Sequence, residues 1–404
     1  MNSVSTPELN LNPYHPAVTT LKTAHSTDHI SSSSLPVTDS ATSASDTAPH
    51  CHPMLFPLHT SCTQQIEDAS LPTPPGETNF PAKQATIYFP APVHPEAIQY
   101  AKSRFGQVIT SQEMDRDQAW NVCHGVVNRA NPITSQTIEK APKLCAISIV
   151  GVGYDTIDIP ACREKDVAVM NCPGANSSAV AELTLALTLW LLRRVAELDR
   201  RLRSGEKMLS IDNLGKGLKG KIVGMIGMGD TARKAAELFH HAFNCPIHIF
   251  SPTSPATRWT SHDPNGTLPH TRHTSLSNLL PLVDILTLHC PLTVSTRDLI
   301  SDKELAIMKE GSILVNMSRG AVVNEGALAE ALKIGKTIGG AASDVFKHEP
   351  AHKDDVAGLL DLDNFIGTPH IGGSTVEAQI DVCLLAIDQL AGYFDGYQIH
   401  NRVC

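Results

Sequence analysis

Residues 221–239 read KIVGMIGMGDTARKAAELF, an apolar run followed by a glycine-containing loop and an amphipathic run. The apolar run predicts a buried strand, and the amphipathic run predicts a helix from Ala232 to Phe243. Gly227 permits a tight turn, Gly229 lets a phosphate approach the backbone, and the small Ala232 lets the helix pack closely on the strand. The helix N-terminus then faces the phosphate. This segment predicts a dinucleotide-binding strand, turn and helix.

More short apolar runs follow at regular intervals, namely PIHIF (246–250), DILTLH (284–289) and SILVNM (312–317). Their alternation with helix-like stretches predicts a parallel sheet covered by helices on both faces. Upstream, strands are expected in ATIYF (85–89), GVVNR (125–129) and LCAISIV (144–150). Helices are expected at Pro95–Phe105, Ser177–Ser204 and Ser374–Tyr393. The long helix at Ser177–Ser204 is apolar almost all round, so we expect part of it to meet a second copy of the chain.

Three residues with acid/base or charge chemistry follow predicted strands: Arg319 in NMSRG, Glu349 in DVFKHEP and His370 in TPHIGG. Ligand-binding residues of α/β proteins lie at strand ends of this kind. Histidine has the unperturbed pKa nearest neutrality, so His370 suits proton transfer to a carbonyl oxygen during hydride transfer. Glu349 beside it would favour the imidazolium. Arg319 can hold a carboxylate through two hydrogen bonds.

Several motifs extend this pattern from about Ala85 to the C-terminus: GVGYDTID, NCPGANSSAVAEL, GMIGMG, HCPLT, VNMSRG and TPHIGGST. In this order they resemble the D-isomer-specific 2-hydroxyacid dehydrogenases, the family of phosphoglycerate, glycerate and D-lactate dehydrogenases. The resemblance implies an α/β fold of two domains: a Rossmann-type doubly wound parallel sheet and a smaller flavodoxin-like substrate domain. It divides the chain into 85–175 (substrate domain, first part), 176–370 (dinucleotide-binding domain) and 371–404 (a C-terminal helix returning to the substrate domain). It also implies a homodimer.

Motif and resemblance together indicate the residues of the site. Arg319, Glu349 and His370 are expected to be catalytic. The substrate is expected to contact Asn128, Arg129, Val152, Gly153, Asn176 and Arg319. The dinucleotide is expected to contact Gly227, Gly229, Asp230, Thr231, Ala232, Ser251, Thr253, Arg258, Cys290, Pro291, Met317, Ser318, Asp344 and Gly372.

Two positions bear on the cofactor. Asp230 brings a negative charge near the pyrophosphate, so either its side chain points to solvent or cofactor affinity is lowered. Ser251 stands where enzymes that use NAD carry an acidic residue that repels a 2'-phosphate. Thr253 and Arg258 follow closely enough to surround such a phosphate. The cofactor is therefore NAD or NADP, with NADP favoured.

Composition narrows the remaining possibilities. A net charge of -9 provides no broad basic surface for nucleic acid. The ten cysteines show no metal-binding spacing, so we expect no metal and reduced thiols. The apolar stretch 179–192 is too short to span a bilayer, and a cytoplasmic location is expected. Residues 1–84, rich in Ser, Thr and Pro, predict a disordered extension.

Two functions remain open. The first is an oxidoreductase that interconverts a small 2-keto acid and its D-2-hydroxy acid with a nicotinamide dinucleotide. Asn128 stands at the position where phosphoglycerate-specific members carry a basic residue, which leaves hydroxypyruvate, glyoxylate or another short 2-keto acid open. The second is a dinucleotide-binding scaffold of the corepressor type, which has the same fold and the same three residues.

Overall fold

A computed structural model describes residues 80–129 and 131–404. Most of the predicted disordered extension, residues 1–79, lies outside this part of the chain. For residues 80–84 the prediction of disorder was wrong. Ala82–Gln84 form a 3-10 helix, Ala82 is buried, and the ring of Phe80 stacks on Phe394 at 5.5 Å between centroids. These two apolar side chains are ordered because they pack on the C-terminal helix.

The first sheet has five parallel strands in the order β2-β1-β3-β4-β5, as in flavodoxin-like folds. Its strands are β1 Thr86–Phe89, β2 Gln107–Thr110, β3 Gly125–Asn128, β4 Ala146–Ile149 and β5 Ala168–Met170. Alternate side chains along each strand face opposite layers. One layer holds α1 (Pro95–Arg104) and α11 (Val376–Phe394), and the other holds α2 (Arg116–Val122), α3 (Ser135–Glu139) and α4 (Ile159–Glu164).

The second sheet has seven parallel strands in the order β12-β11-β10-β9-β6-β7-β8. Its strands are β6 Val223–Ile226, β7 Ile247–Phe250, β8 Thr271–Arg272, β9 Ile285–Leu288, β10 Ser312–Asn316, β11 Ile338–Ser343 and β12 Phe365–Gly367. Successive strands are added in one direction from β6 to β8 and in the opposite direction from β9 to β12, which is the doubly wound arrangement predicted from the sequence. Helices α5 (Ser177–Leu192) and α7 (Asp230–Phe243) cover one face; α8 (Leu276–Leu279), α9 (Asp302–Ala306) and α10 (Glu325–Ile334) cover the other.

The helix predicted at Ser177–Ser204 is two helices, α5 and α6 (Val195–Arg203). Arg194 between them has φ 54°, which stops the first helix. The carbonyl of Leu192 accepts a hydrogen bond from the amide of Lys216 (2.7 Å), so the end of α5 is capped by a distant segment. Side chains of α5 pack on the second sheet, while no residue of α6 is buried.

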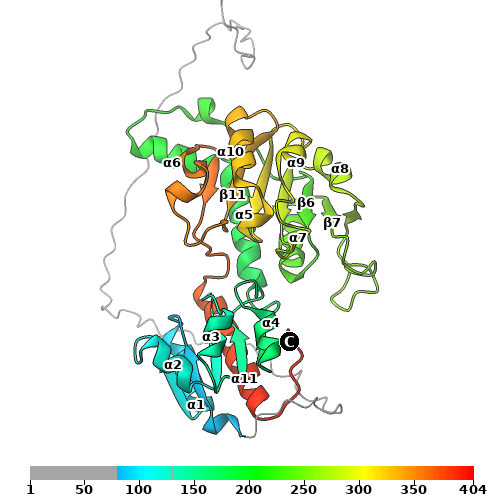
Figure 1. Ribbon diagram of the computed structural model, residues 1–404. Helices are drawn as coiled ribbons and strands as arrows, with labels where there is room; N and C mark the ends of the chain where they lie inside the picture. Colours follow the sequence, from blue (N-terminus) through cyan, green and yellow to red (C-terminus); the bar gives the residue numbers. More distant parts are fainter. Residues whose placement is uncertain (1–79, 130) are drawn as a thin grey trace, which may run out of the picture. The chain divides into compact units, whose positions relative to one another are not determined.

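The C-terminal helix α11 returns to the first sheet, as expected. Figure 1 shows it in the same part of the molecule as α1, α3 and α4, and its residues Val382, Ile387 and Leu390 are buried with those of β1 and β3. This packing supports the division at 175/176 and 370/371, which we retain as a proposal. No helix in residues 80–129 and 131–404 is long and apolar enough to cross a membrane.

Candidate active site

A cleft of about 610 Å³ opens at the carboxyl ends of strands from both sheets. Its volume is in the range of small-molecule and cofactor sites. Many of the predicted site residues line it: Arg129, Val152, Gly153, Asn176, Gly229, Asp230, Thr231, Cys290, Pro291, Met317, Ser318, Arg319, Asp344, His370 and Gly372. Other predicted residues are not part of its lining: Asn128, Gly227, Ala232, Ser251, Thr253, Arg258 and Glu349.

The glycine loop adopts the predicted strand, turn and helix. Gly227 has φ +104°, and a Cβ atom there would lie 2.7 Å from the carbonyl oxygen of His289, so only glycine fits this position. The helix begins at Asp230, two residues earlier than predicted, because Gly229 already occupies the N-cap. The Thr231 and Ser177 hydroxyls lie 3.2 Å apart and join the first turns of α7 and α5.

Asp230 has two favourable interactions that neither sequence alternative considered. It is the first residue of α7, where a carboxylate is favoured by the helix dipole. Its Oδ1 lies 3.5 Å from Nη2 of Arg258, so part of its charge is offset. The side chain is also half exposed. Together these features reduce the repulsion expected between Asp230 and a pyrophosphate.

The region predicted to meet the adenosine ribose is organised by arginines. Ser251 is buried and its hydroxyl lies 2.8 Å from that of Ser254. Arg258 donates from Nε to the carbonyl of Met228 (2.6 Å), which fixes it beside the glycine loop. Arg272 on β8 donates to the carbonyls of Ser251 and Ser254, both at 2.9 Å. Arg272 was not predicted from the sequence, because only the pairing of β7 with β8 brings it close to Ser251 and Ser254.

The contact expected between His370 and Glu349 is present in the structure. Nδ1 of His370 lies 2.7 Å from Oε2 of Glu349, and the other carboxylate oxygen accepts the amide of Phe346 at 3.0 Å. The hydrogen bond to Glu349 raises the pKa of His370, although burial acts in the opposite direction. Burial of Glu349 opposes its ionisation, but the bonds from His370 and Phe346 outweigh it and lower the pKa of the carboxyl. Both residues therefore favour their charged forms, an imidazolium on His370 and a carboxylate on Glu349.

Arg319 lies in the same cleft and is already engaged. Its Nε donates to Oδ1 of Asp155 (3.0 Å), and Nη1 donates to the carbonyl of Ser318 (2.8 Å). A Cβ atom on Gly153 would overlap with Nη2 of Arg319, so the guanidinium lies directly against the backbone of the GVGYD loop. Asp155 was not among the residues predicted for the site.

Asp344 organises the loop that carries His370. The residue is buried, and its carboxylate accepts the Thr368 hydroxyl (2.6 Å), the Ile371 amide (2.8 Å) and the Gly372 amide (2.7 Å). Its carbonyl accepts the amide of His370 at 2.8 Å. His370 has φ 54°, an uncommon conformation for a residue with a side chain, and these bonds hold it there. A contact from Asp344 to the nicotinamide stays a proposal.

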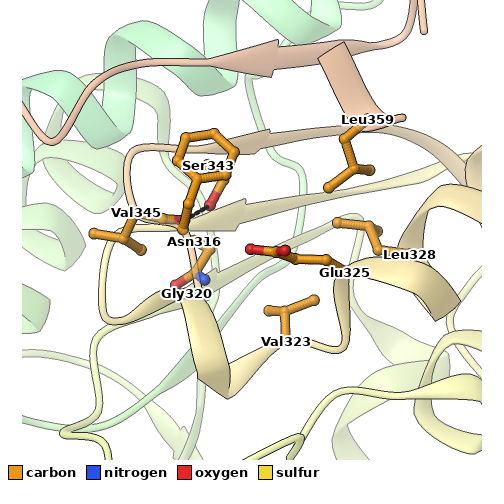
Figure 2. Close-up of a pocket in the computed structure, with 9 residues that line it drawn as sticks. Asn316, Gly320, Val323, Glu325, Leu328, Ser343, Val345 and Leu359 are labelled. Carbon is orange, nitrogen blue, oxygen red and sulfur yellow. Dashed lines mark hydrogen bonds between the residues drawn. The ribbon is translucent and has the colours of Figure 1, made fainter. Parts of the chain in front are cut away.

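A small pocket is lined by residues that include Asn316, Gly320, Glu325 and Phe346 (Figure 2). The side chain of Glu325 points into it, and Oε1 accepts the amide of Lys347 at 2.7 Å. Asn316 donates from Nδ2 to the carbonyl of Arg319 at 3.0 Å. Gly320 lies so close to Phe346 that a Cβ atom would overlap with its backbone. The loops that carry Arg319 and Glu349 are thus packed against one another.

The predicted substrate residues divide into two groups. Arg129 is exposed and lines the cleft, whereas Asn128 is buried and donates its amide to the carbonyl of Asn131 (3.0 Å). Asn171 also lines the cleft and donates to the carbonyl of Val152 at 2.8 Å, although the sequence analysis had not assigned it a role. Of these two neighbours in sequence, only Arg129 lines the cleft.

His289 also lines the cleft, but its ring makes no polar contact there with the residues that the structure describes. Both ring nitrogens are buried, without a hydrogen-bond partner in the described part of the chain. Burial lowers the pKa of His289 to about 4, so the ring is neutral near pH 7. Among the described residues, no group of three or more His, Cys, Asp or Glu could hold a metal ion.

The fold and the cleft together define a class of protein. A doubly wound sheet carries a glycine loop at its switch point, and an acid/base pair and an arginine lie at neighbouring strand ends. These are the parts of an α/β oxidoreductase that binds a nicotinamide dinucleotide.

Comparison with known proteins specifies the family. Residues 185–372 match the family model described as D-isomer specific 2-hydroxyacid dehydrogenase, NAD binding domain. The glyoxylate/hydroxypyruvate reductase B of Pectobacterium carotovorum subsp. carotovorum (strain PC1) is 36% identical over 322 residues, which cover 76% of this chain and 98% of that protein. The hydroxypyruvate reductase of Thermotoga maritima is 35% identical over 306 residues, covering 74% of this chain and 95% of that protein.

A solved structure agrees with these sequence matches. The glyoxylate reductase of Paecilomyes thermophila superimposes with a TM-score of 0.67 at 26% identity, covering 80% of this chain and 98% of that one. The chain belongs to the D-isomer-specific 2-hydroxyacid dehydrogenases. It is a dehydrogenase that acts on the CH–OH group of its donors with a nicotinamide dinucleotide as cofactor.

Proposed function

We propose that this dehydrogenase reduces glyoxylate, hydroxypyruvate or another short 2-keto acid to the D-2-hydroxy acid. The observation that carries the proposal is the 2.7 Å contact between His370 and Glu349 in a cleft that also contains Arg319. A bound nicotinamide dinucleotide would supply the hydride. The His370 imidazolium would give its proton to the carbonyl oxygen. Glu349 stabilises the imidazolium before transfer, and Arg319 holds the substrate carboxylate.

The substrate assignment rests on relatives and on the cleft. The two bacterial relatives described above are named for glyoxylate and hydroxypyruvate. Arg129 is the exposed cation that could meet a distal anionic group, but the neighbouring Asn128 is buried and engaged with Asn131. The position at which phosphoglycerate-specific members carry a basic residue is thus filled by a buried, neutral side chain, which favours short 2-keto acids over phosphoglycerate.

For the cofactor we propose that NADPH serves at least as well as NADH. Ser251 carries no charge that would repel a 2'-phosphate, and Arg258 is held nearby by Met228 and Asp230. Arg258→Ala should weaken NADPH selectively, because an arginine-phosphate contact is charge-assisted. A tenfold preference for NADH in kcat/KM, about 1.4 kcal/mol, would contradict the assignment. We further propose a cytoplasmic homodimer.

The decisive experiment is turnover with a panel of 2-keto acids, followed through oxidation of NADH and NADPH. Wild-type protein should reduce glyoxylate or hydroxypyruvate. His370→Ala should lower kcat by about a hundredfold or more while still binding dinucleotide. The exposed His400→Ala serves as the matched control and should keep wild-type turnover. Absence of turnover with every keto acid would instead favour the corepressor-type scaffold.

A further inference from the structure

The ion pair between Asp155 and Arg319 joins two parts of the cleft that are far apart in the sequence. Asp155 follows β4 of the first sheet, and Arg319 follows β10 of the second. Their contact is short, 3.0 Å between Nε and Oδ1, and both side chains remain partly exposed to the cleft. A substrate entering the cleft therefore meets an arginine that already has a carboxylate partner.

The geometry of the guanidinium limits how it can take a second carboxylate. A two-bond grip uses two neighbouring nitrogens of the fork. Nη1 is bonded to the carbonyl of Ser318, whose position is set by the adjacent backbone, and Nε is bonded to Asp155. Among the described contacts Nη2 has no acceptor. A grip through Nη2 and Nε becomes possible once Asp155 releases Nε.

The position of the guanidinium matters as much as its bonds. Nη2 lies against Gly153, and Val152 and Gly153 line the cleft and are among the residues expected to contact the substrate. Asp155 is two residues further along the same loop, so its carboxylate draws Arg319 onto that segment. Arg319 is then held against the loop through Asp155 and Gly153. In this position the groups expected to contact the substrate contact each other instead.

We propose that Asp155 is an internal competitor for the substrate carboxylate and so determines substrate affinity. In the free enzyme Asp155 holds Arg319 on Gly153; the carboxylate of a 2-keto acid displaces it and takes Nε and Nη2. This inference rests on the proposed function, since it assigns the carboxylate that replaces Asp155. Asp155 acts through Arg319 and is a positioning residue that need not touch the reacting atoms.

The test compares wild-type protein with Asp155→Asn, which keeps the shape of the side chain and removes its charge. Asp158→Asn is the matched control: Asp158 lies in the same loop, caps α4 through the amide of Ala161 (3.1 Å), and asparagine caps helices equally well. Two readouts are used. They are KM and kcat for glyoxylate, and the Kd of oxalate measured by calorimetry with NADH bound.

Removing one partly exposed competing charge should lower both KM and the oxalate Kd about two- to fivefold, with kcat within about twofold of wild type. Asp158→Asn should change neither value. Unchanged or weaker oxalate binding in Asp155→Asn, or a loss of kcat at constant KM, would overturn the inference and indicate that Asp155 only orients Arg319. Asp155→Ser provides a second variant in case the first folds poorly.

The two proposals fail in different ways. If wild-type protein reduces no keto acid, the proposed function fails, yet the oxalate titration still compares the two proteins. If wild-type protein reduces glyoxylate and Asp155→Asn shows no gain in affinity for glyoxylate or oxalate, only the role of Asp155 fails. Failure of both proteins to bind oxalate would also overturn that role.

Discussion

At the scale of single residues, the imidazole of His370 depends on a carboxylate for its charge. The hydrogen bond that His370 donates to Glu349 is the largest cause of the raised pKa of His370, ahead of the opposing effect of burial. A raised pKa keeps His370 protonated to higher pH, so stability from this group is present below its unfolded pKa and lost as pH rises through the folded pKa. The lowered pKa of Glu349 acts in the other direction, with stability lost as pH falls through it.

This dependence predicts the effect of Glu349→Gln on catalysis. Reduction needs the imidazolium, so kcat should fall as pH rises through the pKa of His370. A neutral amide does not support the charge, and the fall should shift to lower pH. The measurement is kcat for keto-acid reduction across pH 5 to 9 at saturating cofactor, a range around the ordinary histidine pKa of about 6.5. An unchanged profile would argue against this role of Glu349.

Asp344 allows a second prediction at this scale. Asp344→Asn retains one oxygen acceptor for the three donors of Thr368, Ile371 and Gly372, which leaves a buried amide without its partner. We expect a loss of about 1–3 kcal/mol in unfolding free energy and a lower kcat, because the His370 loop loosens. Denaturant titration measures the first. Thr368→Val, which removes a single donor, should show the smaller effect; equal effects would contradict the assignment.

Some residues of the cleft could be predicted from the sequence, and others could be found only in the structure. Arg319, Glu349 and His370 were predictable because each belongs to a local motif at a strand end. Asp155, Arg272 and the loop-holding role of Asp344 were not, since their partners lie in other parts of the chain and only the folded sheets bring them together.

At the scale of elements, the two loops that carry Arg319 and Glu349 are packed against each other at Gly320. A side chain there would overlap with the backbone of Phe346. Gly320→Ala should therefore push the loops apart, lower kcat by about tenfold or more and reduce stability. Activity and thermal unfolding measure both effects.

Gly326→Ala provides the control for this substitution. Gly326 lies in α10, and a Cβ atom there would meet only Oδ1 of Asn324 at 3.5 Å, an ordinary contact. Since alanine favours a helix over glycine, Gly326→Ala should be neutral or stabilising by up to about 1 kcal/mol. Similar losses in both variants would show that contact between the loops is not the cause.

Strands were predicted correctly where the hydrophobic pattern of the sequence marks them. The end of a helix was missed where it depends on contacts with distant parts of the chain. The apolar runs at β1, β3, β4, β6, β7, β9 and β10 were predicted as strands. The end of α5 was missed because its cap comes from Lys216, and Arg194 adopts a conformation that its residue type does not signal. The 3-10 helix at Ala82–Gln84 was missed because its order comes from packing on α11.

At the scale of the whole molecule, a group of apolar side chains remains exposed along α5, α6 and the segment that follows. Exposed fractions are 48% for Trp190, 64% for Leu202, 69% for Leu209, 68% for Ile211 and 68% for Leu214. Soluble monomers rarely expose large contiguous apolar areas, so we propose that these side chains contribute to a partner surface. The proposed homodimer would cover it with the same group of a second copy.

If these side chains form the dimer interface, the mass of the protein in solution should depend on them. Light scattering at micromolar concentration should give twice the chain mass for wild type, and Leu209→Lys/Ile211→Lys should give the monomer, because burying two unpaired charges opposes association. Ile334→Lys is the matched control: Ile334 is 72% exposed at the end of α10, outside this group, and should leave the dimer intact. A monomeric wild type would refute the dimer. If Ile334→Lys also gave the monomer, the interface would include the end of α10, because a charge at position 334 opposes association only if the interface buries it.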